Sequence, residues 1–207
     1  MKQERKNHWE GVYQEKRFTD VSWYQELPER SLALIKATGV GRDEAIIDVG
    51  GGASTLVDHL VQSGYRDLTV VDISAQGLEQ AQARLGAAAG QVRWIVSDVI
   101  EFKPERRYSL WHDRAVLHFL TDAADREHYV DALKSALPPG GHLVLATFGP
   151  DGPLKCSGLE VRRYSVEMMS ELLGPEFDLQ YQDLEFHATP AGGTQQFLVT
   201  RWRRTEA

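Results

Sequence analysis

Three consecutive glycines preceded by an aspartate form the segment of this sequence best suited to ligand chemistry. In AIIDVGGGASTLVDHL (residues 45–60) an apolar run ends near Asp48, and Gly50, Gly51 and Gly52 follow before a helical pattern begins. Glycine lets a ligand approach the backbone closely, and the start of a helix favours negative charge. A carboxylate beside this turn would repel a pyrophosphate and would suit an ammonium group. The segment therefore favours a ligand with an amino acid end.

A dinucleotide is the alternative ligand for such a turn. Nicotinamide-binding sites usually carry G-x-G-x-x-G after a strand, with an acid about 20 residues further on. Gly50 and Gly52 occupy the first two glycine positions, but Thr55 stands at the third. This departure and the presence of Asp48 disfavour a nicotinamide-dependent oxidoreductase, which stays open as an alternative.

Two further acids end the next two expected strands. Asp72 lies at the end of LTVVDI (68–73), and Asp98 ends VRWIVSD (92–98). Ligands of open parallel sheets bind at the carboxyl ends of the strands, where the strand order reverses. Either acid alone could cap the following helix. Their places after successive strands favour a site shared with the glycine turn.

Strands and helices alternate along the chain, which predicts the scaffold that holds these residues. Strands are expected at 45–49, 68–73, 92–98, 108–113 and 142–148, helices at 4–16, 26–38, 54–64, 75–89, 122–137 and 165–173, and a closing hairpin at 177–186 and 195–202. This order predicts a three-layer α-β-α, doubly wound, mostly parallel seven-stranded sheet with a C-terminal antiparallel hairpin.

Composition narrows the function classes. The chain has 207 residues, a formal net charge of −7 and no basic stripe, which argues against nucleic acid as a partner. Its single cysteine allows no internal disulfide and no cysteine zinc site, and no metal is expected. The charged start lacks the apolar core of a signal peptide, and no stretch is long enough to span a bilayer. A cytoplasmic protein without membrane partners is expected.

The motifs together resemble the class I S-adenosylmethionine-dependent methyltransferases. DVGGGAS (48–54) is similar to the first motif of that family, acid-x-Gly-x-Gly-x-Gly, with Ser54 where the last glycine is most usual. VVDIS (70–74) and VSDV (96–99) match the acidic ends of its second and third strands. WHDRAVLHFL (111–120) resembles the fourth-strand motif of the thiopurine and tellurite-resistance types.

The resemblance also covers the ends of the chain. HWEGVYQEK (8–16) and VSWYQELP (21–28) resemble the N-terminal segment of a small bacterial subgroup, which also carries CSGL (156–159) and H-x-T-P-x-G (187–192). It implies one methyltransferase domain over residues 1–207, with a helical cap (1–40) over the cofactor site and a Rossmann-like core (41–207). S-adenosylmethionine would be the cofactor and S-adenosylhomocysteine its product.

The cofactor residues implied by the resemblance are Asp48, Gly50, Gly51, Gly52, Ser54, Asp72, Ile73, Ser97, Asp98, Val99 and Asp113, with Trp23 and Tyr24 closing over the ligand. Asp72 would accept from the ribose hydroxyls, and Ile73 would pack on the adenine. Asp98 would accept from the adenine amino group, and Asp48 would orient the amino group of the methionine. Trp9 is expected in the core instead.

The catalytic residues and the acceptor are less defined. Asp113 would border the methyl group, and His112, Arg114, His118 and His187 could face the acceptor; a general base is needed only for a protonated nucleophile. A small acceptor, such as a thiol, selenium or tellurium compound, halide or amine, is favoured over a protein lysine. A noncatalytic nucleoside-binding domain stays open, as does the choice between monomer and homodimer.

Overall fold

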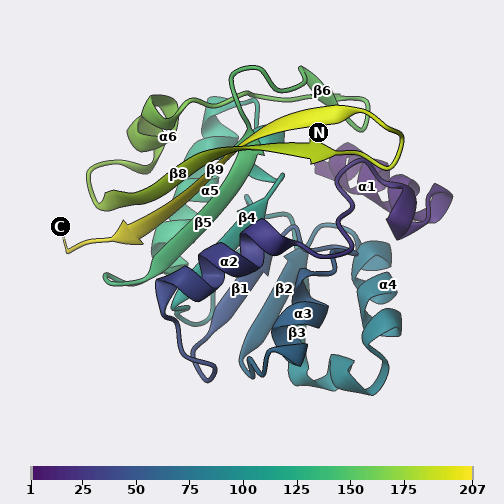
Figure 1. The fold of residues 1–207 in the computed structure, drawn as a ribbon, viewed down its shortest axis with the longest axis horizontal. Helices are drawn as coiled ribbons and strands as arrows, with labels where there is room; N and C mark the ends of the chain where they lie inside the picture. The colour runs from purple at the N-terminus through teal and green to yellow at the C-terminus, as the bar shows by residue number, and fades with distance from the viewer. Residues whose placement is uncertain (1, 207) are drawn as a thin grey trace.

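The centre of the structure, a computed structural model that describes residues 2–206, is a seven-stranded sheet (Figure 1). Its order is β3 (Val92–Val96), β2 (Leu68–Asp72), β1 (Ile46–Val49), β4 (Leu110–Arg114), β5 (His142–Phe148), β9 (Thr194–Arg204) and β8 (Phe177–Ala188). The first five strands are parallel, whereas β9 runs antiparallel to β5 and to β8. The predicted doubly wound sheet with a C-terminal hairpin is therefore confirmed.

Helices cover both faces of this sheet (Figure 1). They are α1 (Lys2–Glu15), α2 (Glu29–Thr38), α3 (Leu56–Gln62), α4 (Ala75–Leu85), α5 (Ala123–Ala136) and α6 (Val166–Leu173), with short 3-10 turns η1 (Phe18–Asp20), η2 (Gly86–Gln91) and η3 (Leu117–Phe119) and a small hairpin of β6 (Lys155–Cys156) and β7 (Leu159–Glu160). Because side chains alternate along a strand, Ile46 packs in the core under α2 and α3, and Ile47 in the core under α5 and α6.

Two helices differ in extent from the sequence prediction for local reasons. The segment expected to be helical over 26–38 begins only at Glu29, directly after Pro28. The segment expected over 75–89 leaves the α-helix at Leu85, because Gly86 takes a positive φ of 57° and a 3-10 turn follows.

The strand order reverses between β1 and β4. The chain runs outward from β1 to β2 and β3, and then returns to the other side of β1 with β4. The carboxyl ends of β1 and β4 thus border a crevice, which is where open α/β sheets bind ligands. Helix α1 lies against α4 at this end of the sheet (Figure 1).

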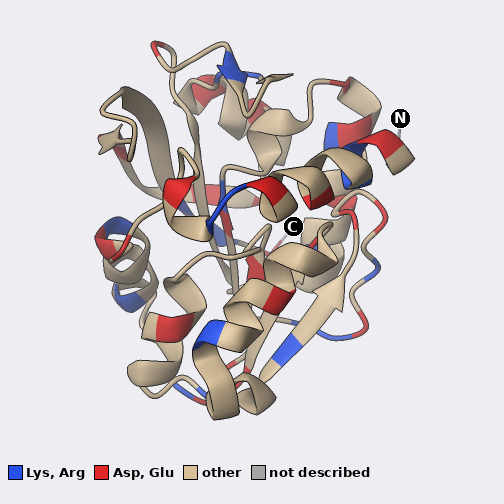
Figure 2. Ribbon diagram, turned by 90° about the vertical axis from the view of Figure 1, so that its right-hand side faces the viewer, with Lys and Arg blue, Asp and Glu red and all other residues tan. Residues whose placement is uncertain are grey.

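Charged residues of both signs are interspersed over the elements seen in Figure 2, including α1. No helix within residues 2–206 combines the length and the apolar character needed to cross a membrane.

Candidate functional site

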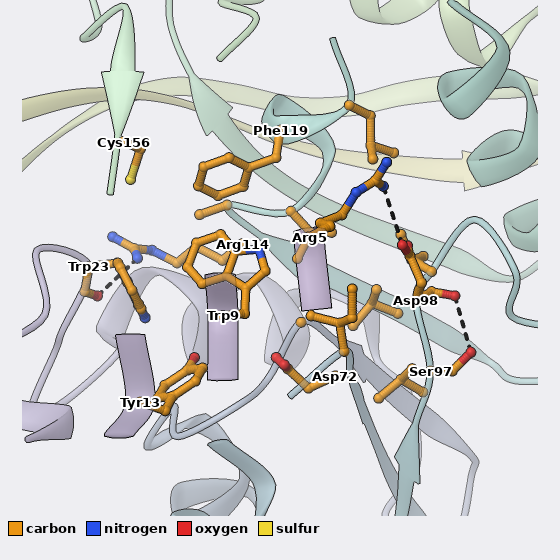
Figure 3. Close-up of a pocket in the computed structure, with 18 residues that line it drawn as sticks. Arg5, Trp9, Tyr13, Trp23, Asp72, Ser97, Asp98, Arg114, Phe119 and Cys156 are labelled. Atoms are coloured by element: carbon orange, nitrogen blue, oxygen red, sulfur yellow. Dashed lines mark hydrogen bonds and ion pairs between the residues drawn. The ribbon is translucent and has the colours of Figure 1, made fainter. Parts of the chain in front are cut away.

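A cavity of about 730 Å³ opens at the carboxyl ends of β1, β2, β3 and β4 (Figure 3). Its walls come from α1, the 16–28 segment, four strand ends and β6, and consist of Arg5, Trp9, Tyr13, Trp23, Val49, Gly50, Val71, Asp72, Ile73, Ser97, Asp98, Val99, Arg114, Ala115, Val116, Phe119, Leu120 and Cys156.

The glycine turn after β1 is needed for packing within the protein as well as for any ligand. Gly50 has a φ of +67°, and a Cβ there would lie 1.9 Å from Val116 Cγ2. At Gly52, with φ +39°, a Cβ would lie 2.3 Å from Tyr13 Oη and 2.9 Å from Asp72 Oδ2. The missing side chains therefore let η3 and α1 close onto the turn.

Asp72 and Asp98 stand together at one end of the cavity, as expected from their places after β2 and β3 (Figure 3). The Ser74 backbone N–H donates to Asp72 Oδ1 at 2.8 Å. Burial, together with the charge of Asp48, raises the pKa of Asp72 to about 7. Burial also raises the pKa of Asp98, against the opposing effect of Arg5. Ile73, Ser97 and Val99 line the same end.

Helix α1 is fastened over this end by its own charged side chains. The carboxylate of Glu10 accepts from Ser74 Oγ (2.8 Å) and from the backbone N–H groups of Ala75 (2.9 Å) and Gln76 (3.2 Å), at the first turn of α4. Arg5 lies 3.4 Å from Asp98 Oδ2. Arg5, Glu10 and Tyr13 were not among the predicted site residues. Glu10 and Tyr13 lie within HWEGVYQEK (8–16), and the signal for Arg5 was the run of charges in the first helix.

Aromatic rings form the middle of the cavity. Trp9 makes edge-on contacts with Trp23 at 5.7 Å and with Phe119 at 4.9 Å between ring centroids. Trp9 thus lines the cavity, in place of the core position expected for it. Tyr13, at the lower edge in Figure 3, is 6.3 Å from Trp23, and burial and the charge of Asp72 raise its pKa well above the usual value.

A second cavity of about 540 Å³ lies on the other side of Trp23, Gly50 and Arg114, which border both. Asp48, Gly51, Ser54 and Tyr24 line this second cavity and not the first.

Asp48 in this cavity is hydrogen-bonded to His112, which is hydrogen-bonded in turn to Ser31. His112 Nδ1 lies 2.7 Å from Asp48 Oδ1, and His112 Nε2 lies 2.9 Å from Ser31 Oγ. The second carboxylate oxygen of Asp48, Oδ2, is buried without a hydrogen-bond partner.

Arg114 and Cys156 form the wall farthest from Asp98 (Figure 3). An Nη1 hydrogen of Arg114 is donated to the Trp23 carbonyl at 3.2 Å, and Nη2 lies 3.6 Å from Glu185 Oε1 without a hydrogen bond. The Cys156 thiol is buried, and burial raises its pKa. Arg114 is thus the one catalytic candidate that borders the cavity.

Asp113 lies apart from both cavities, in contrast to its expected place beside the methyl group. Its Oδ1 accepts from the Val116 N–H at 2.9 Å, and its Oδ2 accepts from the Leu117 N–H at 3.1 Å and the Tyr129 hydroxyl at 2.7 Å. The side chain is fully buried and closes the turn into η3. Its burial raises its pKa to about 6.

The two remaining histidine candidates also lie outside the cavities that Trp23 separates. His118 is fully buried, and its Nδ1 accepts from the Phe148 N–H at 3.2 Å; burial, aided by the charge of Arg114, lowers its pKa to about 3. His187 on β8 donates from Nε2 to the Ser22 carbonyl at 2.8 Å. Neither histidine lines the first or the second cavity.

Comparison with known proteins shows which family of proteins this chain is similar to. A family model described as a methyltransferase domain matches residues 47–143. Nodulation protein S of Rhizobium tropici is 33% identical over 101 residues, which cover 49% of this chain and 42% of that protein, so the chain spans less than half of this relative. EEF1A lysine methyltransferase 2 of Danio rerio is 24% identical over 83% of this chain and 79% of that protein.

Solved structures share the whole architecture. The 1,6-didemethyltoxoflavin-N1-methyltransferase of Burkholderia thailandensis, solved with 1,6-didemethyltoxoflavin and S-adenosylhomocysteine, has a TM-score of 0.75 at 22% identity and covers 98% of this chain and 88% of its own. The N-methyltransferase NodS of Bradyrhizobium japonicum WM9, solved with S-adenosylhomocysteine, has a TM-score of 0.71 at 18% identity, over 95% of this chain and 98% of its own. At these identities the likeness establishes the fold.

Proposed function

We propose that this chain, which belongs to the class I S-adenosylmethionine-dependent methyltransferases, transfers a methyl group from S-adenosylmethionine to a small-molecule acceptor. One observation carries the proposal. Acids from three adjacent strands, Asp48, Asp72 and Asp98, border two joined cavities at the point where the strand order reverses.

The residues present fit this cofactor. The buried, unpartnered Oδ2 of Asp48 can accept from an ammonium group, which relieves the cost of an unsatisfied buried oxygen. Asp72 can accept from ribose hydroxyls, and Asp98 from the adenine amino group, with Ile73 and Val99 as apolar walls. A carboxylate at each end of the site also suits the positive charge of the ligand.

The residues of this chain would mainly orient and enclose the reactants. When bound, S-adenosylmethionine supplies a methyl group on a sulfonium, which leaves readily as a thioether. Trp9, Trp23 and Phe119 supply aromatic rings, whose faces favour a cationic centre and whose apolar bulk excludes water. Alignment of a nucleophile with the methyl group accounts for most of the rate in such a site. We further propose that α1 and the 16–28 segment act as a cap that completes it.

The wall at Arg114 and Cys156 supports a small acceptor that needs no base. Among the described residues no histidine lines the first cavity, and its phenol and thiol have raised pKa values and stay protonated at neutral pH. The carboxylates stand at the opposite, nucleoside end (Figure 3). Thiolates, selenides and halides attack without losing a proton, so these acceptors suit the wall better than a protonated amine.

A protein lysine is the second candidate acceptor. It is favoured by the similarity to EEF1A lysine methyltransferase 2, which extends over 83% of this chain. A lysine side chain would have to reach the methyl group through the aromatic wall of Trp9 and Phe119. Transfer of radiolabelled methyl groups to cell-lysate proteins, but to no small acceptor, would favour this candidate.

Titration calorimetry with S-adenosylmethionine and S-adenosylhomocysteine tests the proposed function. We expect both to bind the wild-type protein, with affinity lost by roughly 10- to 150-fold in Asp72→Ala, because hydrogen bonds to a charged group contribute about 1.5–3 kcal/mol. Methyl transfer would then be screened over thiols, selenide, halides and amines. A folded wild-type protein that binds neither ligand would refute the proposal.

A further inference from the structure

The second cavity contains a chain of three hydrogen-bonded side chains that methyl transfer itself does not require. Ser31 from α2, His112 from β4 and Asp48 from β1 follow one another at 2.9 Å and 2.7 Å. All three are buried, at 6%, 3% and 4% exposure. Burying a polar group costs free energy unless the group is hydrogen-bonded, so three buried polar side chains in a row indicate a specific role.

With Asp48 ionised and His112 neutral, the two hydrogen bonds run in one direction. An ionised carboxylate only accepts hydrogen bonds, so Nδ1 of His112 carries the proton and donates to Asp48 Oδ1. In a neutral imidazole the other nitrogen then accepts, so the Ser31 hydroxyl donates to His112 Nε2. His112 therefore donates to Asp48, and the Ser31 hydroxyl favours the histidine tautomer that makes this donation possible.

The hydrogen bonds among Ser31, His112 and Asp48 use one carboxylate oxygen of Asp48 and leave the other for a ligand. Oδ2 is buried and has no hydrogen-bond partner, and Asp48 is one of the residues that line the second cavity. A Cβ at Gly51 would lie 2.5 Å from Val70 Cγ1 and 2.7 Å from this oxygen, so only a glycine fits beside the carboxylate. One oxygen is thus committed to His112, and the other is aimed at the glycine turn.

We propose that Ser31 and His112 are positioning residues, which hold Asp48 oriented so that Oδ2 receives the ammonium group of the bound cofactor. The second cavity is then the subsite for the amino acid end of the ligand, and the first cavity holds the nucleoside. This inference rests on the proposed function. It makes the two side chains responsible for selecting nucleosides that carry an amino acid end.

Two ligands separate this role from a purely structural one. S-adenosylhomocysteine and 5′-methylthioadenosine share the adenosine and the thioether sulfur, and only the first carries the amino acid end. Their affinities are measured by calorimetry for the wild-type protein, His112→Leu, His112→Asn and Ser31→Ala, with melting curves to show that each variant is folded. The Asn amide can place an N–H near the position of the histidine Nδ1, whereas Leu cannot.

We expect His112→Leu to weaken S-adenosylhomocysteine binding by about 10-fold or more, as the loss of a hydrogen bond supporting a charged group implies. Binding of 5′-methylthioadenosine should change by less than about threefold, since it lacks the group that Asp48 receives. His112→Asn should recover part of the loss, and Ser31→Ala should show a smaller loss with the same ligand selectivity.

The inference would be overturned if the folded variants lost affinity equally for both ligands, or lost affinity for neither. If His112→Leu does not fold, Ser31→Ala and His112→Asn decide by the same comparison of ligands. If the wild-type protein binds S-adenosylhomocysteine but the variants weaken the binding of both ligands equally, only the role of Ser31 and His112 is refuted, and the proposed function is not. A wild-type protein that binds neither ligand would refute the proposed function.

Discussion

Because the carboxyl group of Asp72 is buried, we expect the ligand-free wild-type protein to be less stable at neutral pH than the Asp72→Asn variant, in which an amide of the same shape replaces the carboxyl group. Burial raises its pKa from 3.8 to about 7 in the folded chain. The folded state therefore holds this proton more tightly than the unfolded state between these pH values. The stability that the group contributes is fully present below pH 3.8, falls as pH rises through this window, and is lost above pH 7.

The size of this difference in stability follows from the shift in the pKa of Asp72. At about 1.4 kcal/mol for each pKa unit, the shifted titration of Asp72 lowers the free energy of unfolding, relative to its value below pH 3.8, by roughly 2 kcal/mol at pH 5 and by roughly 4 kcal/mol at pH 8. Asp72→Asn removes this cost and keeps an oxygen that can accept from the Ser74 N–H. We expect the variant to be more stable than the wild type, with a gain about 2–3 kcal/mol larger at pH 8 than at pH 5.

Urea unfolding of the ligand-free proteins at the two pH values, followed by the fluorescence of the five tryptophans, measures this difference. Asp178→Asn, at an exposed position of β8, is the matched control and should change stability by less than about 0.5 kcal/mol at either pH. A gain in Asp72→Asn that is the same at both pH values would refute the reasoning. The same variant should bind S-adenosylhomocysteine at least about 10-fold more weakly, because the amide carries no charge to strengthen a hydrogen bond.

Three shorter predictions follow from other contacts. Gly50 has a φ of +67°, and a Cβ there would lie 1.9 Å from Val116 Cγ2, so Gly50→Ala should lower the free energy of unfolding in urea by more than about 1 kcal/mol. Adding Val116→Ala should recover only the part of this loss that comes from the clash, and not the part that comes from the backbone conformation. Glu10→Ala removes three hydrogen bonds at α4 and should speed amide exchange in α1 and weaken S-adenosylhomocysteine binding, with α5 exchange unchanged. His118, with its pKa lowered from 6.5 to about 3, contributes stability that is lost as pH falls through this window, so His118→Phe should flatten the acid side of the stability curve.

Local patterns predicted the fold because the sheet is built from them. The apolar run 45–49 and the alternation of strands with helices define the order of elements, and PPGG after the last long helix marks its end. Acids after successive strands also converge in space for a local reason, since parallel strands end at one edge. The grouping of Asp72 with Asp98 therefore needed no tertiary information.

The rest of the site depends on contacts between distant segments. Nothing near Glu10 indicates that it meets the start of α4, 64 residues further on. Asp113 ends a parallel strand like the other acids, but the N–H groups of η3 and the Tyr129 hydroxyl take its oxygens. Ser31 has no local signal at all, because its role depends on a histidine 81 residues away.

The docking of α1 also bears on how the protein is made. This helix is the first part of the described chain to be synthesised, yet Arg5 pairs with Asp125, 120 residues downstream. The nascent chain must therefore carry α1, with its tryptophan and tyrosine, without these partners until α4 and α5 have emerged. The wall that α1 contributes to the cavity is thus synthesised before the segments that hold it in place.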